Sequence, residues 1–147
     1  MNCVHWLSPG DPAQRTGGYL YNARISDAMR DLGVLVEVVV LESVWPVGGD
    51  SHAESLDAIP DGATVVADGL LWPGLLPEER ARLCDRTRVW VVVHSLMDKE
   101  GSEHLAALET MSLSEADGCF ATSMRTAAIV AERMTKESVA VVVPGTE

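Results

Sequence analysis

Short runs of β-branched and other apolar residues alternate along this chain with longer segments of helical periodicity. The apolar runs have almost no polar alternation, which is typical of strands that helices cover on both faces of a parallel sheet. Helices placed between such strands predict an α/β architecture. We expect strands at residues 2–7, 34–41, 63–67, 88–93, 118–122 and 138–143.

The segments between these strands have the spacing of amphipathic helices. From residue 17 to residue 32, apolar side chains recur at helical spacing and polar ones occupy the other side. The apolar set is Tyr21, Ile25, Ala28, Met29 and Leu32, and the polar set is Asn22, Asp27, Arg30 and Asp31. Gly33 should end this helix in a left-handed conformation. Further helices are expected at 53–58, from Pro77 onward, at 102–115 and at 123–134. The fold class is therefore a Rossmann-like three-layer αβα sandwich with a mainly parallel sheet of about six strands.

The length and charge of the chain exclude several classes of function. Its 147 residues suit a single domain spanning 1–147. Asp and Glu number 22 against 11 Lys and Arg, and the net charge of −11 argues against nucleic acid or an anionic lipid surface as a partner. Three cysteines without a C-x-x-C pair favour reduced thiols over a zinc ribbon or a disulfide framework. No apolar run approaches the ~20 residues that span a bilayer, so we expect a cytoplasmic protein without an integral membrane segment.

Polar residues at the carboxyl ends of the strands are the candidate site, because ligands bind there in doubly wound folds. His94 directly follows the run from Val91 to Val93, where an imidazole can hydrogen-bond a substrate hydroxyl or exchange a proton. Asp68 follows the third strand and suits either a substrate hydroxyl or the cap of the next segment, with capping slightly favoured. Gly17 and Gly18 open the first helix, where free amides attract phosphate, although a flexible helix entry explains the two glycines equally well.

Several other residues fit a structural role better than a chemical one. Cys3 and His5 share one strand face, but two ligands make a poor metal site, so we expect core packing there. Glu109 lies at the edge of an apolar helix stripe and is expected to be a boundary or capping carboxylate. Trp6 and Trp90 lie in predicted strands and are expected in the core. Trp45 and Trp72 lie in predicted loops and suit the lining of an acceptor groove.

The order of motifs along almost the whole chain resembles the N-terminal half of the retaining glycosyltransferase family 4, which has the GT-B architecture. Each motif is common by itself, and their order and spacing together make the resemblance more specific. The segments that carry it are Ser8 to Pro12, Thr16 to Tyr19, Val65 to Leu70, Val91 to His94, Cys119 to Ser123 and Val141 to Glu147.

The resemblance implies one half of a two-domain enzyme. In GT-B enzymes the N-terminal domain mainly binds the acceptor, and the C-terminal domain, which is absent from this chain, binds the sugar nucleotide. It implies that Gly17 and Gly18 lie near the donor diphosphate and the acceptor, and that His94 contacts the donor sugar as the catalytic residue. Thr16, Tyr21 and Asp68 would be further substrate-binding residues. The sugar nucleotide is a co-substrate, and no metal or other cofactor is expected.

The resemblance also limits what this chain should do alone. The family's Arg/Lys pair and E-x₇-E element belong to the second domain, so we expect weak acceptor binding and negligible turnover from these residues by themselves. The alternative is a stand-alone Rossmann-like binding or regulatory module, or one subunit of a split enzyme. A phosphoacceptor receiver domain is a weak version of it, because only Asp11 fits the acids that such a domain has after its first strand.

Overall fold

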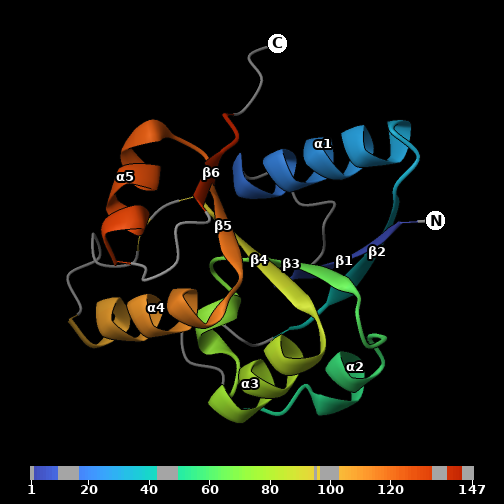
Figure 1. Cartoon of the computed structure of the whole chain (residues 1–147), viewed down its shortest axis with the longest axis horizontal. Helices are drawn as coiled ribbons and strands as arrows, with labels where there is room; N and C mark the ends of the chain where they lie inside the picture. Colours follow the sequence, from blue (N-terminus) through green and yellow to red (C-terminus); the bar gives the residue numbers. More distant parts are fainter. Residues whose placement is uncertain are drawn as a thin grey trace.

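A computed structural model of the chain describes residues 2–9, 17–42, 50–94, 96, 103–133 and 139–143. Its strands form one six-stranded sheet in the order β2-β1-β3-β4-β5-β6, and all neighbouring pairs are parallel. The predicted α/β fold with a parallel sheet of about six strands is confirmed (Figure 1). The strands are β1 (Cys3–Ser8), β2 (Leu35–Val40), β3 (Thr64–Asp68), β4 (Arg88–Val93), β5 (Gly118–Ala121) and β6 (Val139–Val141).

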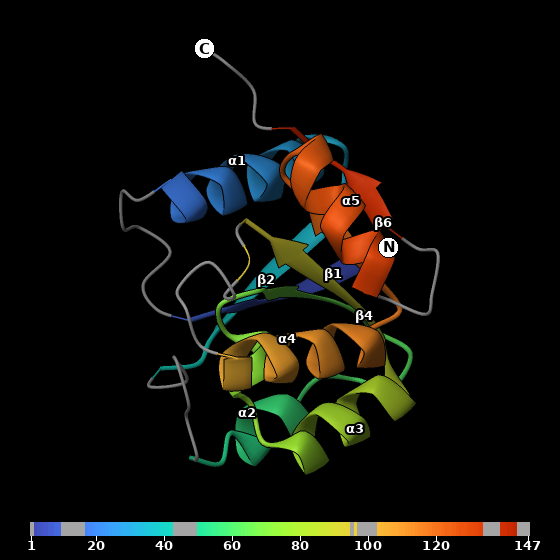
Figure 2. The same cartoon turned by 90° about the vertical axis from the view of Figure 1, so that its left-hand side faces the viewer.

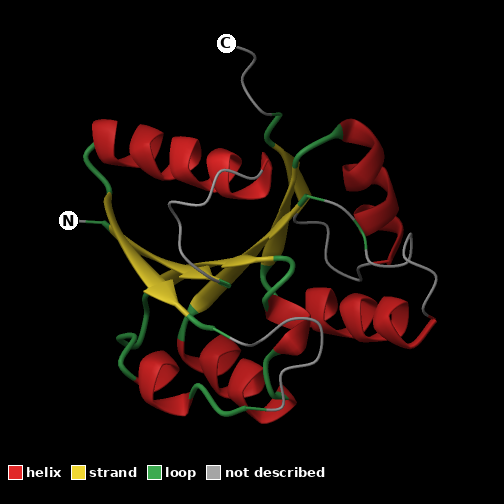
Figure 3. Ribbon diagram, turned by 180° about the vertical axis from the view of Figure 1, so that it is seen from behind, coloured by secondary structure: helices red, strands yellow, loops and turns green. Residues whose placement is uncertain are grey.

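Helices cover both faces of the sheet and complete three layers. Helix α1 lies on one face, and α2, α3 and α4 lie on the opposite face (Figures 2 and 3). Helix α5 packs beside β5 and β6, with Val130 in the same apolar cluster as Cys119. The helices are α1 (Gly17–Asp31), α2 (Ala53–Asp57), α3 (Pro77–Arg86), α4 (Glu103–Glu115) and α5 (Met124–Arg133), with a short 3₁₀ helix η1 (Trp72–Gly74) that the sequence did not predict.

The alternation of side chains along the strands divides the core into two clusters. Val91 and Val93 of β4 belong to the larger cluster, on the side of α3 and α4. Val92, between them, belongs to the smaller cluster, which also contains Trp6 and Tyr21. Both sets are almost fully buried, which explains why β4 is apolar at nearly every position.

Several helix boundaries follow from single residues. Gly33 adopts a φ of +86° after α1, as predicted, because a residue without a Cβ takes this conformation at little cost. Gly62 has a φ of +79° in the turn that leads into β3. Pro77 occupies the first turn of α3 together with two glutamates, where the helix dipole favours carboxylates.

The predicted apolar side of α1 is only partly correct. Tyr21 is buried as expected, but Ala28 is exposed, and Leu32, which follows the end of α1 at Asp31, is 84% exposed. Asn22, assigned to the solvent side, is only 7% exposed and faces the carboxyl edge of the sheet. A polar side chain therefore lies inside the contact between α1 and the sheet.

The tryptophans also differ from the sequence-based expectation. Trp6 is buried as predicted, whereas Trp90 is half-buried and stacks on Phe120 with ring centroids 4.9 Å apart. Trp72 does not line a groove: it is fully buried in η1, and its Nε1 donates a 2.7 Å hydrogen bond to the carbonyl oxygen of Ser112. Trp45 lies outside the described residues.

Arg80 of α3 is a buried cation that periodicity did not predict. Its side chain has no exposed surface, and its Nε donates a 2.7 Å hydrogen bond to Glu115 of α4. One terminal nitrogen donates to the carbonyl oxygens of Pro73 and Leu75, at 3.2 and 2.6 Å. The guanidinium thus joins η1, α3 and α4 and holds together the layer on that face. Among the described helices, none has the length and apolar character needed to cross a bilayer.

Candidate functional site

The strand order reverses at β1, which marks the carboxyl edge of the sheet as the place to look for a site. β1 lies between β2 and β3, so the chain leaves β1 towards one side and continues from β3 towards the other. In doubly wound sheets, ligands bind at such a reversal of strand order, outside the carboxyl ends of the strands. Asp68 ends β3, His94 follows β4, and α1 begins after the loop that follows β1. The predicted site residues Asp68 and His94 therefore lie at the edge where a ligand is expected.

Asn22 of α1 joins these two residues. Its Nδ2 donates a 2.9 Å hydrogen bond to Asp68 Oδ2, and its Oδ1 lies 3.2 Å from His94 Nε2. His94 Nε2 also lies 3.9 Å from Asp68 Oδ2. Asp68, Asn22 and His94, which we call the edge cluster, come from three separate parts of the sequence.

The hydrogen bonds of the edge cluster define the tautomer of His94. A carboxylate only accepts hydrogen bonds, so the amide nitrogen of Asn22 faces Asp68 and the amide oxygen faces His94. Nε2 of a neutral His94 must then carry the proton, and Nδ1 is left as an acceptor. Burial lowers the pKa of His94, and the nearby Asp68 carboxylate opposes this change. A lowered pKa leaves the ring mostly neutral at neutral pH, and Nδ1, which has no hydrogen-bond partner in the described parts of the chain, can then accept a hydrogen bond from a ligand.

Asp68 is positioned by the backbone that follows it. Its Oδ1 accepts a 2.8 Å hydrogen bond from the backbone N–H of Leu70, which closes a local turn. The capping role favoured from the sequence is not what the structure has, because the next helix, η1, has Leu71 as its N-cap residue and no side-chain capping hydrogen bond. Gly69, between Asp68 and Leu70, donates its N–H to the carbonyl oxygen of Val92 at 2.8 Å. A Cβ on Gly69 would lie 2.6 Å from that oxygen, so only glycine allows the backbone after β3 to come this close to β4. The close contact ties the end of β3 to β4, just before His94.

Tyr21, which directly precedes Asn22 on α1, packs against the ring of His94. The two rings meet edge to face, with centroids 5.1 Å apart and an interplanar angle of 89°. The Tyr21 hydroxyl donates a 2.8 Å hydrogen bond to the carbonyl oxygen of Val142, after β6. Burial raises the pKa of this phenol, so it remains a neutral donor. Tyr21 thus holds the ring of His94 and connects α1 to the last strand.

A pocket of about 150 Å³, here called the α1 pocket, adjoins the edge cluster through Asn22. Its polar lining includes Ser8 at the end of β1 and Ser26, Asp27 and Arg30 along α1. Trp6 also lines it, and the buried indole N–H of Trp6 has no hydrogen-bond partner among the described residues. A buried donor without a partner is unfavourable, but this N–H has almost no accessible surface, so the pocket does not present it to a ligand in this conformation. The α1 pocket has the volume of a small polar group or a few water molecules.

The remaining predicted residues have different outcomes. Gly17 and Gly18 are the first two residues of α1, whose start lies at the same edge as Asp68 and His94. Thr16, Asp11 and the last residues from Pro144 to Glu147 lie outside the described residues. Glu109 is 3% exposed and lies 3.6 Å from Arg133 of α5, consistent with a structural carboxylate between two helices.

Asn22 is the residue that sequence reasoning missed. An asparagine with polar neighbours on a helix is most simply assigned to the solvent side. The available signal was its position directly after Tyr21 in the first turns of the helix, facing the edge where ligands were expected. A comparison with protein-family models gives no match, and neither does a comparison with curated protein sequences. The fold and site together define a doubly wound parallel α/β protein with a polar cluster at its switch point.

Proposed function

We propose that this chain is the acceptor-side domain of a glycosyltransferase that transfers a sugar from a nucleotide-sugar donor to an acceptor hydroxyl. The observation that supports it best is the convergence of Asp68 and His94, through Asn22, at the carboxyl edge of the sheet. Asp68 and His94 belong to two separate motifs of the family-4 resemblance. Their proximity is what a shared site for one ligand requires.

The chemistry of the edge cluster suits a polyhydroxylated ligand. A neutral His94 offers Nδ1 to a sugar hydroxyl, while Asn22 and Asp68 hold the ring in this tautomer. The adjoining α1 pocket adds polar side chains along α1, among them Ser26 and Asp27. In this proposal His94 contacts the donor sugar, and the amides of Gly17 and Gly18 lie near the diphosphate.

The cationic part of the chemistry would come from a second domain. A departing diphosphate needs preorganised positive charge as its own charge develops, and a neutral His94 provides none. The donor-binding domain is therefore the partner that this proposal requires, and the domain described here holds the acceptor.

The proposal is tested with the polypeptide encoded by the complete reading frame. It is incubated with a panel of sugar nucleotides and acceptors, and glycosylated products are detected by mass spectrometry. We expect transfer, and we expect His94→Ala to lower kcat by about 10²-fold, as is typical when a contact to the transition state is lost. His104→Ala, on the exposed side of α4, is the matched control and should keep the activity.

The alternative is a binding or regulatory module. It is favoured by the hydrogen bonds of Asp68, whose two carboxylate oxygens already accept from Leu70 and Asn22. A carboxylate with both oxygens bonded in this way suits a structural or ligand-binding role better than proton transfer. This alternative gains if the complete polypeptide transfers no sugar but binds a small ligand, with loss of binding in Asn22→Ala. Transfer that is unaffected by His94→Ala would remove His94 from the site.

A further inference from the structure

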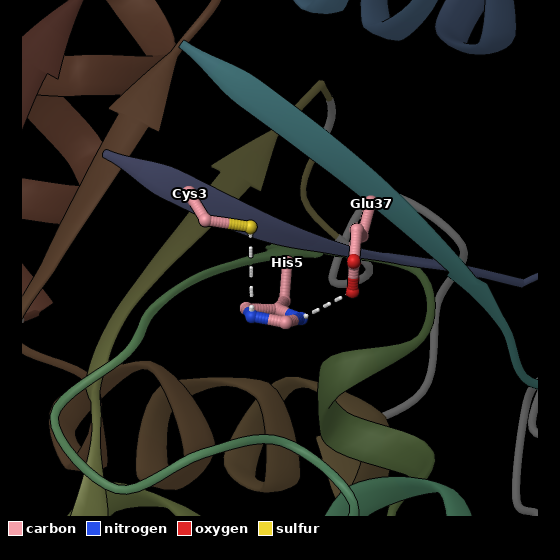
Figure 4. A group of neighbouring side chains, drawn as sticks. All are labelled: Cys3, His5 and Glu37. Atoms are coloured by element: carbon pink, nitrogen blue, oxygen red, sulfur yellow. Dashed lines mark hydrogen bonds and ion pairs between the residues drawn. The ribbon is translucent and has the colours of Figure 1, made fainter. Parts of the chain in front are cut away.

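Cys3, His5 and Glu37 lie together on two neighbouring strands, away from the edge cluster (Figure 4). Cys3 and His5 are on the same face of β1, and the sheet register places Glu37 of β2 directly beside His5. His5 Nε2 lies 3.8 Å from Cys3 Sγ, and its Nδ1 lies 3.4 Å from Glu37 Oε2. The thiol and the carboxylate thus approach the imidazole from its two sides.

We propose that these three side chains bind a divalent cation of borderline softness, such as Zn²⁺. One ligand atom from each residue lies within 4.8 Å of the other two. Ligands of a tetrahedral Zn²⁺ with sulfur and nitrogen or oxygen donors are separated by about 3.3 to 3.6 Å, from bond lengths of about 2.0 to 2.3 Å. One metal binds only one ring nitrogen, so a cation on Nε2 beside Cys3 requires the Glu37 carboxylate, which now faces Nδ1, to change rotamer and turn towards it.

The side chains that must move are able to do so. The Glu37 side chain is 69% exposed, so a change of rotamer meets little resistance, whereas the side chain of His5 is only 9% exposed. Cys3 is half-buried at the beginning of β1. The rigid imidazole thus provides the fixed ligand, and the thiol and the carboxylate adjust to it.

The choice of metal follows from the donor set. Thiolate and imidazole ligands favour Zn²⁺ over Mg²⁺ or Ca²⁺, which prefer oxygen donors. Cys3 and His5 also line a depression of about 630 Å³ at the amino edge of the sheet, and water there can supply a fourth ligand. Asp61 and Arg88 line the same depression and carry opposite charges. The site is thus separated from the edge cluster, and the inference does not depend on the proposed function.

A metal at this position would link the side chains of the edge strand β2 and its neighbour β1. Glu37 is the single charged residue of β2, whose other five residues are Leu or Val. A carboxylate in such an apolar strand is explained if Glu37 is the third metal ligand beside Cys3 and His5 of β1. The simpler explanation is that Glu37 and Cys3 only satisfy the hydrogen bonds of a buried histidine, and it predicts no stoichiometric metal.

The experiment uses the full 147-residue chain, freed of metal and titrated with Co²⁺, followed by Zn²⁺. We expect one Co²⁺ per chain, a thiolate-to-cobalt charge-transfer band, and loss of that band when Zn²⁺ displaces the cobalt. Cys3→Ser should abolish the band, while Cys84→Ser, which changes a half-buried cysteine outside the site, should keep it.

Glu37→Gln provides a second variant that should fold normally, because the side chain is largely exposed. We expect it to weaken Zn²⁺ binding by about 10-fold or more, measured by calorimetry, with Glu78→Gln on α3 as the unchanged control. Circular dichroism verifies that each variant is folded. The inference is overturned if the chain binds no Co²⁺ in stoichiometric amount, if the band survives Cys3→Ser, or if Glu37→Gln binds Zn²⁺ as tightly as the unchanged chain.

Discussion

Replacing Gly69 with alanine tests how the end of β3 is held against β4. The added Cβ would lie 2.6 Å from the carbonyl oxygen of Val92, whereas ordinary contacts begin at 3.4 Å. The turn must therefore retreat by about 0.8 Å, which lengthens the 2.8 Å hydrogen bond from the Gly69 N–H beyond useful range. Overpacking of this kind costs about 1–3 kcal/mol, and the lost hydrogen bond adds about 1 kcal/mol. We expect Gly69→Ala to lower the free energy of unfolding by about 2–4 kcal/mol.

Urea denaturation measures this change directly. With a urea dependence of about 2 kcal/mol per molar, the midpoint should fall by about 1–2 M. Gly33→Ala is the matched control, because a Cβ there meets open space and only the φ of +86° is strained, at about 1–2 kcal/mol. The ring resonances of His94 provide a second measurement: they should shift in Gly69→Ala and stay unchanged in Gly33→Ala. The reasoning is refuted if Gly69→Ala costs less than about 1 kcal/mol and leaves the His94 resonances in place.

Three further predictions concern His94, Arg80 and Tyr21. Because burial lowers the pKa of His94, the unfolded chain binds more protons than the folded one just below the ordinary histidine pKa of about 6.5, so the free energy of unfolding should fall as the pH drops through that range. Urea unfolding at about pH 7.5 and 5.5 should show a smaller pH effect in His94→Gln; an equal effect would contradict the assignment. Arg80→Met leaves Glu115 and two carbonyl oxygens without their donor and should destabilise by about 3–5 kcal/mol in urea unfolding; a loss below about 1 kcal/mol would contradict the role given to Arg80. Tyr21→Phe removes the hydrogen bond to Val142 and should cost about 1 kcal/mol in urea unfolding; no loss would show that this bond does not hold α1 to the end of β6.

The strands and helices could be predicted from the sequence because they depend on local patterns. The continuous apolar run from Val91 to Val93 is typical of a strand that is buried on both faces. Gly33 indicates the end of α1, because a residue without a Cβ readily adopts the left-handed conformation that ends a helix. Strands connected by helices also imply the parallel sheet, and with it the edge at which Asp68 and His94 meet. The placement of these two residues at this edge could therefore be predicted from the fold class alone, without knowledge of contacts between distant segments.

Contacts between distant segments could not be predicted in the same way. Asn22 lies between Asp68 and His94 because of the rotation of α1 about its own axis over the sheet. Periodicity predicted this rotation only approximately and assigned Asn22 to the solvent side. Trp72 is buried because the chain after β3 turns inward as a 3₁₀ helix against α4. Arg80 is buried because its guanidinium meets the carbonyl oxygens of Pro73 and Leu75, in and just after η1, and the carboxylate of Glu115 on α4. In each case a polar group is stabilised by partners that are remote in sequence.

The sequence by itself determined the class of fold, the bounds of its elements to within a few residues, and the edge of the sheet that holds the candidate site. Only the tertiary structure decided the orientation of His94 through Asn22, and only the register between β1 and β2 brought Glu37 beside Cys3 and His5. The physical reason is the range of the interactions. Hydrophobic periodicity acts over neighbouring turns and strands, whereas the register of paired strands and the rotation of a packed helix are set by the whole core.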